Sequence, residues 1–149
     1  MTTTTTAICP TNVVIRLDNA AGVLTDISGS TNKCEIKFNN LIAEYSVFGN
    51  TWQNRKACGK DGSFALDIIY TTTASEALDL LNGWFFGPSD AARSIQVDVP
   101  DGLTGSDRYE AEVVLSEHNI PLQARSGEVV MVSMTLLPNG AIVHNNVGS

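Results

Sequence analysis

The stretch SFALDIIYTTTASEALDLLNGWFFGP, residues 63–88, decides the fold, because the period of its apolar residues changes within it. Every second residue of 63–70 is apolar, starting from Phe64. This alternation predicts a strand with one buried face, and it places Asp67 on the opposite, polar face. After Tyr70 the spacing lengthens from two residues to three and four, so a helix follows the strand directly.

The helical part covers about residues 74–86 and is amphipathic, with leucine and aromatic residues at helical intervals. Thr73 and Glu76 have the spacing of a capping box, in which each side chain satisfies a free backbone N–H group of the first turn. The pair Gly87-Pro88 ends the pattern. A single helix of this kind is expected to cover one side or end of a β-structure.

Period-2 alternation recurs along most of the remaining chain, and turn residues such as NAAG, PDGLTG and PNG separate the segments. In one segment Leu41, Ala43, Tyr45 and Val47 share a face. The pattern predicts a mainly β fold, a sandwich or barrel of about seven antiparallel strands with one helix, in a single domain of residues 1–149. The expected strands lie in residues 13–17, 34–38, 41–48, 63–70, 94–99, 108–115 and 128–137.

Composition narrows the functional classes. The formal net charge is −7, the pI is about 4.6, and only 17% of residues are charged. A groove that binds nucleic acid by neutralising phosphates needs a basic field, so this balance argues against one. The first residues carry no signal peptide and no membrane span. Residues 1–11 are expected to form a flexible N-terminal arm, and residues 141–149 a flexible tail.

The sequence contains no pattern typical of a catalytic or metal-binding site. The three cysteines are odd in number and widely spaced, which favours free thiols in a reducing compartment over disulfides or a zinc site. Glu110 and Glu112 lie two residues apart on one expected strand, Asp98 lies on another, and paired carboxylates occur in glycosidases. A solvated strand face explains them better. The loop DGLTGSD lacks the acidic ladder of a calcium site, so the sequence predicts no enzyme, no metal and no cofactor.

The most unusual segment is VFGNTWQNRKACGKDGS, residues 47–63, which carries three of the nine basic residues. A phosphate-binding loop would need glycine where Asn54 stands and a hydroxyl where Asp61 stands, so that hypothesis fails. Cys58 has cationic neighbours, but the sequence places no histidine base beside it. The part from Asn50 to Ser63 is too long for a tight hairpin turn and is expected to be a projecting loop.

The order of these segments resembles the tail tube (major tail) proteins of long-tailed bacteriophages. LDNAAGVLTDIS resembles the first hairpin of that family, and NKCEIKFNNLIAEYSVFGNTW resembles the strands that end in an FG turn and an aromatic. KDGSFALDIIY with ASEALDLLNGWF is similar to its central strand and helix. RYEAEVVLSEHNIPLQARSGEVVMVSMTLLPNGAI is similar to its closing strands. The match spans about residues 12–142, although the basic residues of the 47–63 segment depart from it.

The resemblance implies a non-enzymatic virion subunit. Its members form ring oligomers, usually hexamers, whose sheets join edge to edge, and the rings stack into a hollow tube that conducts DNA. The implied partners are further copies of the chain, other tail proteins at the tube ends, the tape measure protein and passing DNA, with no membrane. The implied location is the virion tail, assembled in the host cytoplasm. Related folds serve as terminators, head–tail connectors and decorations, and a monomeric β-sandwich binding module stays an alternative.

Two sets of residues follow for this role. The projecting loop is expected to contact the next ring through Trp52, Arg55, Lys56, Lys60 and Asp61, although a solvated loop is the alternative. Acidic residues are expected to line the channel, because a wall that repels phosphate does not trap a passing duplex. The candidates are Glu110, Glu112, Asp98 and Asp67, with Glu35 and Glu44 on the polar faces of other strands.

Overall fold

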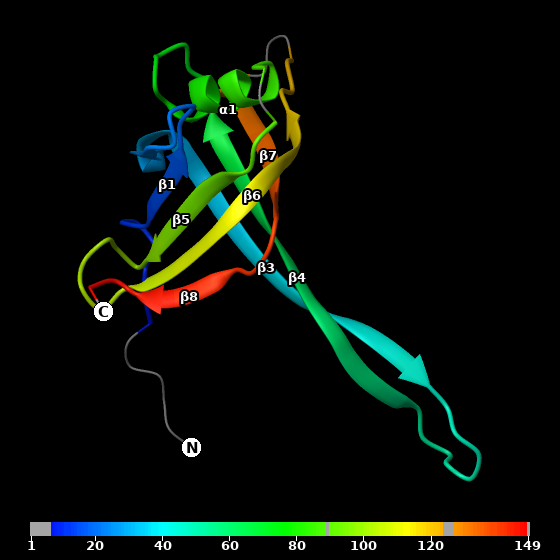
Figure 1. The fold of residues 1–149 in the computed structure, drawn as a ribbon. Helices are drawn as coiled ribbons and strands as arrows, with labels where there is room; N and C mark the ends of the chain where they lie inside the picture. Colours follow the sequence, from blue (N-terminus) through cyan, green and yellow to red (C-terminus); the bar gives the residue numbers. More distant parts are fainter. Residues whose placement is uncertain (1–6, 89, 124–126, 149) are drawn as a thin grey trace.

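The computed structural model describes residues 7–88, 90–123 and 127–148 and contains one antiparallel β-sheet with a single α-helix (Figure 1). The predicted fold class is confirmed, with eight strands in the described residues where about seven were expected. The strands are β1 Val14–Asp18, β2 Leu24–Asp26, β3 Thr31–Tyr45, β4 Asn54–Ile69, β5 Arg93–Val99, β6 Asp107–Asn119, β7 Met131–Pro138 and β8 Val143–Asn146. The helix α1 is Ala77–Phe85, and a 3-10 turn, η1, covers Ser28–Ser30.

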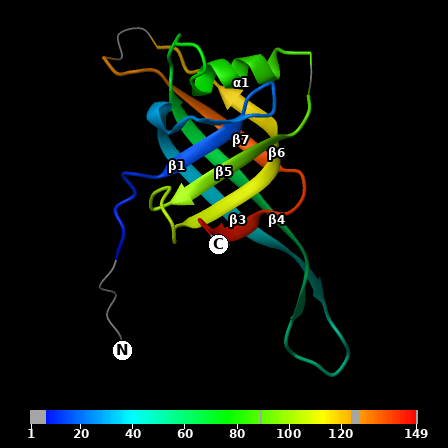
Figure 2. The ribbon, with the colours of Figure 1, turned by 60° about the vertical axis from the view of Figure 1, so that its left-hand side comes forward.

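The strands follow the order β2-β1-β5-β6-β7-β4-β3, and β8 pairs with the first part of β6. The sheet curls, so that β1, β5 and β6 form one side and β3 and β4 form the other (Figure 2). Inward residues of β1 and β5 therefore lie opposite inward residues of β3, and a cavity between the two sides is lined by all three strands. One continuous curled sheet takes the place of two separate layers.

The core fills the inside of this curl, because alternate residues of every long strand point inward. Phe64, Leu66 and Ile68 of β4 are fully buried, as the alternation predicted. Tyr70 lies just past the end of β4 and is exposed, so its predicted inward position is wrong. The other strand residues of the core are Ile15, Leu17, Ile95, Val97, Ala111, Val113, Val132, Met134 and Leu136.

Helix α1 closes one end of the curl (Figure 1). It buries an apolar face that includes Leu81 and Trp84, and the Trp84 indole N–H donates to the carbonyl of Ala91 at 3.1 Å. The predicted capping box is wrong. Glu76 is itself the N-cap residue and accepts a hydrogen bond from the Thr71 hydroxyl, so its carboxylate does not reach back from the third helical position.

The predicted flexible tail is also wrong, because part of it forms β8. Asp107 to Glu110 of β6 pair with Asn146 to Val143 of β8. This polar segment has no apolar alternation that would predict a strand, and it is held by backbone pairing with β6. In the N-terminal arm, residues 1–6 lie outside the described residues. Residues 7–12 are exposed and have no regular structure.

Candidate interaction site at the projecting hairpin

The longest element of the molecule is the hairpin of β3 and β4, and its outer part leaves the body. Strand β7 pairs with β4 only between Phe64 and Ile69. Residues 37–62 therefore continue as a two-stranded ribbon that extends away from the curled sheet (Figures 1 and 2). We call this part the projecting hairpin. A two-stranded ribbon in water is marginally stable on its own, so contacts from outside the chain are expected to support it.

This arrangement corrects the predicted loop. Strand β4 begins at Asn54 and pairs with β3 without interruption except for a bulge near Cys58, so only residues 46–53 connect the two strands. The glycines of GKDG, residues 59–62, lie within the strand and not in a loop, because fourteen residues of β3 supply partners along its length. The segment does project from the body, as expected, but as a two-stranded ribbon and not as a loop.

Apolar side chains are exposed along the whole projecting hairpin. Leu41 and Tyr45 alternate as predicted, but their face has no core to cover, and both are about half exposed. At the tip, Phe48 is fully exposed and Trp52 is 82% exposed. So many exposed large apolar side chains on one segment mark a contact with a partner. The large ones are Phe38, Leu41, Ile42, Tyr45, Val47, Phe48 and Trp52, which are spread over both faces of the ribbon and its tip.

The projecting hairpin is also the most basic part of an acidic chain. Four cations against two carboxylates lie in residues 37–62, whereas the full sequence has nine basic and sixteen acidic residues. Arg55 pairs with Glu44 across the strands, with 2.8 Å between Nε and Oε1. Within the part of the chain that the structure describes, Lys56 and Lys60 form no ion pair, so their charges are free to meet acids of another molecule.

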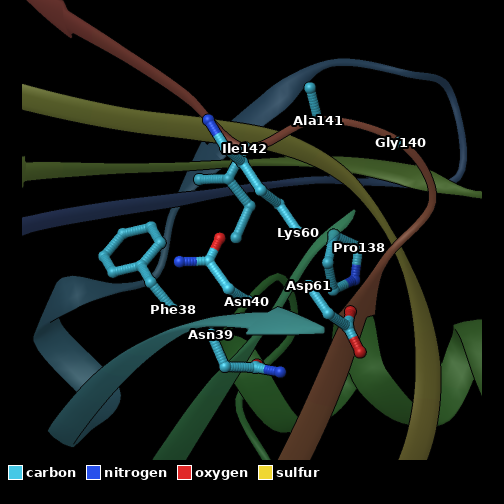
Figure 3. A pocket seen from close by; sticks show the side chains of 9 residues that line it. All are labelled: Phe38, Asn39, Asn40, Lys60, Asp61, Pro138, Gly140, Ala141 and Ile142. Carbon is cyan, nitrogen blue, oxygen red and sulfur yellow. The ribbon is translucent and has the colours of Figure 1, made fainter. Parts of the chain in front are cut away.

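The predicted contact residues separate into two groups. Trp52, Arg55 and Lys56 lie in the outer half of the projecting hairpin, and Lys60 and Asp61 lie at its base. The base forms one wall of a cavity of about 430 Å³ whose other wall is the segment between β7 and β8 (Figure 3). The cavity is lined by Phe38, Asn39, Asn40, Lys60, Asp61, Pro138, Gly140, Ala141 and Ile142.

Close packing at Gly62 fixes the angle at which the projecting hairpin leaves the body. A Cβ atom at this position would lie 2.5 Å from the Lys37 carbonyl oxygen and 2.7 Å from Cδ1 of Ile142. Phe38 adds a second link, with its ring centroid 5.7 Å from that of Tyr109 on β6. The base is thus held by side chains from both sides of the curl, whereas the tip is free.

The predicted channel acids do not form one surface. Glu110 and Glu112 lie on the outer face of β6. Glu110 accepts hydrogen bonds from Gln96 and Asn145 at 3.0 and 2.9 Å, and these lower the pKa of Glu110. Glu112 accepts one from the Ser94 hydroxyl. Both carboxylates therefore present negative charge on the β1-β5-β6 side.

The other two candidates differ from this pair. Asp67 lies on the outer face of β4, on the opposite side of the curl, where it accepts a hydrogen bond from Ser133 at 2.9 Å. Asp98 belongs to the same outer face as Glu110, but its side chain is fully buried, so the expectation of an exposed carboxylate there is wrong. It lies between Arg108, at 2.7 Å, and Arg16, at 2.9 Å.

The surroundings of Asp98 explain its burial. Burial alone would raise the pKa of Asp98, but the hydrogen bonds and charges of Arg108 and Arg16 outweigh it, and the pKa is lowered. The triad joins β1, β5 and β6, because Arg16, Asp98 and Arg108 come from one strand each. The triad could not be predicted from the sequence, because the alternation of apolar residues does not show that two arginines cover the same acid.

The remaining candidates for chemistry do not form a site. Burial raises the pKa of Cys34 to about 11, which keeps its thiol protonated, and Cys9 and Cys58 are exposed. Among residues 7–88, 90–123 and 127–148, no group of three or more metal-ligating side chains converges. Helix α1, at nine residues, is too short to cross a membrane, and the described residues contain no longer helix.

Comparisons with solved structures show where this fold occurs. The chain is similar to a chain of the tail of an empty GTA particle, computed with helical refinement and C6 symmetry, with a TM-score of 0.72, 13% identity and coverage of 93% of this chain and 99% of that one. It is similar to a chain of the anti-feeding prophage baseplate, 6-fold symmetrised, with a TM-score of 0.76, 12% identity and coverage of 99% and 100%.

A third similarity is to a chain of the PVC sheath–tube complex of an extracellular contractile injection system in its extended state, with a TM-score of 0.68, 12% identity and coverage of 95% and 93%. The fold is thus one found in tails and contractile injection particles, and at these identities the similarity concerns the fold alone. The sequence matches no protein-family model, and no curated protein resembles it in sequence.

Proposed function

We propose that this chain is the ring-forming subunit of a tail tube, a non-enzymatic virion protein whose stacked rings conduct DNA from the capsid during ejection. The observation that carries the proposal is the projecting hairpin. Its tip exposes Phe48 and Trp52, Lys56 in its outer half forms no ion pair among the described residues, and β7 pairs with β4 no further than Phe64. Such a ribbon gains a stable position when it packs against a neighbouring subunit.

Ring formation is supported by the open edges of the sheet. In the described residues, β3 and β2 are the terminal strands of the sheet order, and the outer edge of each has no strand partner. A free edge is a liability in a monomer, and closure into a ring removes it. The similar GTA and anti-feeding prophage particles were solved with sixfold symmetry, which supports a hexamer.

The channel lining is proposed to include Glu110 and Glu112. Hydrogen bonds to Gln96 and Asn145 keep Glu110 ionised, and the two carboxylates lie two residues apart on one outward strand face. Asp67 belongs to β4, on the opposite side of the curl, so it is left out of this proposed lining. An acidic wall lets DNA pass because it does not bind phosphate.

The partners of this subunit are proposed to be further copies of the chain, proteins at the two tube ends, the tape measure protein and the passing DNA. The N-terminal arm is proposed to order against a neighbouring subunit. Deleting residues 2–8 is then expected to weaken assembly and to leave the melting temperature of the subunit nearly unchanged. An equal loss of both would show that the arm belongs to the fold of its own subunit.

A second candidate is a terminator, which would form a ring and end a tube. It is favoured by the similarity to a chain from the PVC sheath/tube terminator structure, with a TM-score of 0.67 and coverage of 94% of this chain. Negative-stain microscopy of the purified protein tests the two candidates. A tube subunit forms long tubes on concentration, a terminator forms isolated rings, and a monomeric binding module forms neither.

The channel assignment has its own test. Glu110→Lys with Glu112→Lys is expected to leave tube assembly intact and to slow genome ejection, since lysines in the wall bind passing phosphates. Asp67→Lys, on the other side of the curl, is the matched control and is expected to leave ejection unchanged. Normal ejection with the double lysine variant would remove Glu110 and Glu112 from the channel.

A further inference from the structure

An aromatic surface lies at the pole of the molecule opposite to the projecting hairpin. At the C-terminal end of α1, Phe85 is 53% exposed and Phe86 is 75% exposed. Their ring centroids lie 5.0 Å apart in an edge-to-face arrangement. His118, near the end of β6, contacts both rings, at 5.1 Å from Phe85 and 6.3 Å from Phe86. We call these three residues the aromatic cap.

The aromatic cap is not part of the core of its own subunit. Leu81 and Trp84 of α1 are buried, whereas Phe85 and Phe86, at the end of the helix, are exposed, so the two phenyl rings are left outside that packing. The Nδ1 atom of His118 is buried and has no hydrogen-bond partner among the described residues. The surface therefore exposes aromatic area that its own subunit leaves uncovered, as a docking site for another molecule does.

The charge around the aromatic cap is the reverse of that on the projecting hairpin. Glu76 and Asp79 lie at the start of α1, Asp90 follows the helix, and Glu117 precedes His118. Two basic residues of the described part lie near this pole. Arg93 lies over the Trp84 ring at 4.9 Å, with its guanidinium bonded to backbone carbonyls, and Lys33 of β3 lies 3.9 Å from Glu35. The acids beside α1 thus outnumber the cations of this pole, whereas the outer half of the hairpin offers Lys56.

The two surfaces lie at opposite ends of one subunit. In both views α1 stands at one end of the molecule, and the projecting hairpin extends from the other (Figures 1 and 2). A contact between two different surfaces of identical subunits is heterologous, so it repeats without closing when the surfaces point in opposite directions. This is the geometry that adds one ring to the next.

We propose that the aromatic cap of one copy is the docking surface for the projecting hairpin of a second copy in the adjacent ring. Phe48 and Trp52 of the incoming hairpin cover Phe85 and Phe86, and Lys56, in the outer half of the hairpin, approaches the acids beside α1. The inference rests on the proposed tube function and deepens it by naming the receiving surface. Apolar area at the centre and opposite charges at the rim are the arrangement that stable interfaces use.

The test is site-specific photo-crosslinking in assembled tubes. p-Benzoylphenylalanine replaces Phe48, which preserves an aromatic side chain at the hairpin tip, and ¹⁴N- and ¹⁵N-labelled subunits are mixed before assembly. We expect mass spectrometry to find crosslinks from position 48 to residues 77–92 or 115–122 of a copy with the other label. The same photo-residue at Leu103, an exposed loop position outside both surfaces, is the control and is expected to give none there.

A substitution experiment checks the receiving side independently. Phe85→Ser with Phe86→Ser is expected to leave rings intact and to raise the concentration at which tubes form by about tenfold or more, whereas Leu103→Ser leaves it unchanged. Tubes with crosslinks only to other surfaces, or normal elongation of the double serine variant, would overturn the aromatic cap and leave the tube function standing. A wild-type protein that forms no tubes would overturn the proposed function itself.

Discussion

Trp52→Ala gives the sharpest test of the projecting hairpin. The Trp52 side chain is 82% exposed in the subunit, so its apolar area is available to a partner and contributes little to the fold. A buried tryptophan removes about 150–250 Å² from water, and at about 25 cal/mol per Å² the loss of most of this area costs about 3–4 kcal/mol per contact. Interface tryptophans whose loss costs more than about 2 kcal/mol are typical hot spots.

The cost repeats at every subunit of a ring, so elongation should fail at concentrations where the wild-type protein forms tubes. Rings themselves should form, and the melting temperature of the subunit should stay within about 1 °C, because an exposed side chain adds little to stability. Sedimentation velocity measures the ring-to-tube ratio, and negative-stain microscopy measures tube length. Leu103→Ala, at another exposed position, is the matched control. Tubes of normal length from Trp52→Ala would refute the contact of Trp52 with the next ring and would show that the hairpin tip is solvated.

Three predictions concern the fold that carries this surface. Asp98→Asn should destabilise the subunit by about 3 kcal/mol in urea unfolding at pH 7, because it leaves two arginines around a neutral group. Since the pKa of Asp98 is lowered in the fold, its stabilisation is present above about pH 4 and is lost as the pH falls further, so the variant should show a flatter acid-unfolding profile; equal profiles would contradict this. Gly62→Ala should lower the free energy of unfolding by about 1–3 kcal/mol through its clash with a backbone carbonyl, whereas Gly59→Ala, whose nearest contact is 3.4 Å away, should be tolerated. Equal melting temperatures for the two variants would contradict this. Deleting residues 143–149 should lower the melting temperature by several degrees because β6 loses the pairing of β8, and an unchanged value would return this segment to a flexible tail.

The sequence predicts well where one face of a segment meets the core. Phe64, Leu66 and Ile68 alternate because the inside of the curl is apolar and the outside is not, and the pattern records that difference directly. The helix is predicted for the same reason, although its start is displaced because Glu76 bonds to Thr71 before the first turn. Local periodicity therefore gives the class of fold.

Apolar alternation does not predict the surroundings of a residue whose contact partner is remote in sequence or lies in another molecule. Leu41 and Tyr45 alternate like core residues, yet their face is exposed, because periodicity records a buried face without saying which molecule buries it. The burial of Asp98 depends on arginines 82 and 10 residues away. Likewise Gly62 looks like a turn residue, and only the approach of Ile142 shows that it is a packing position.

The proposed function depends on rings of this subunit stacking on one another. Negative-stain microscopy of the purified wild-type protein across a concentration series, with light scattering on the same samples, measures this stacking. We expect rings at low concentration and tubes of stacked rings at high concentration, with the sixfold symmetry that the similar particles show. A protein that stays strictly monomeric at the highest concentration would contradict the account.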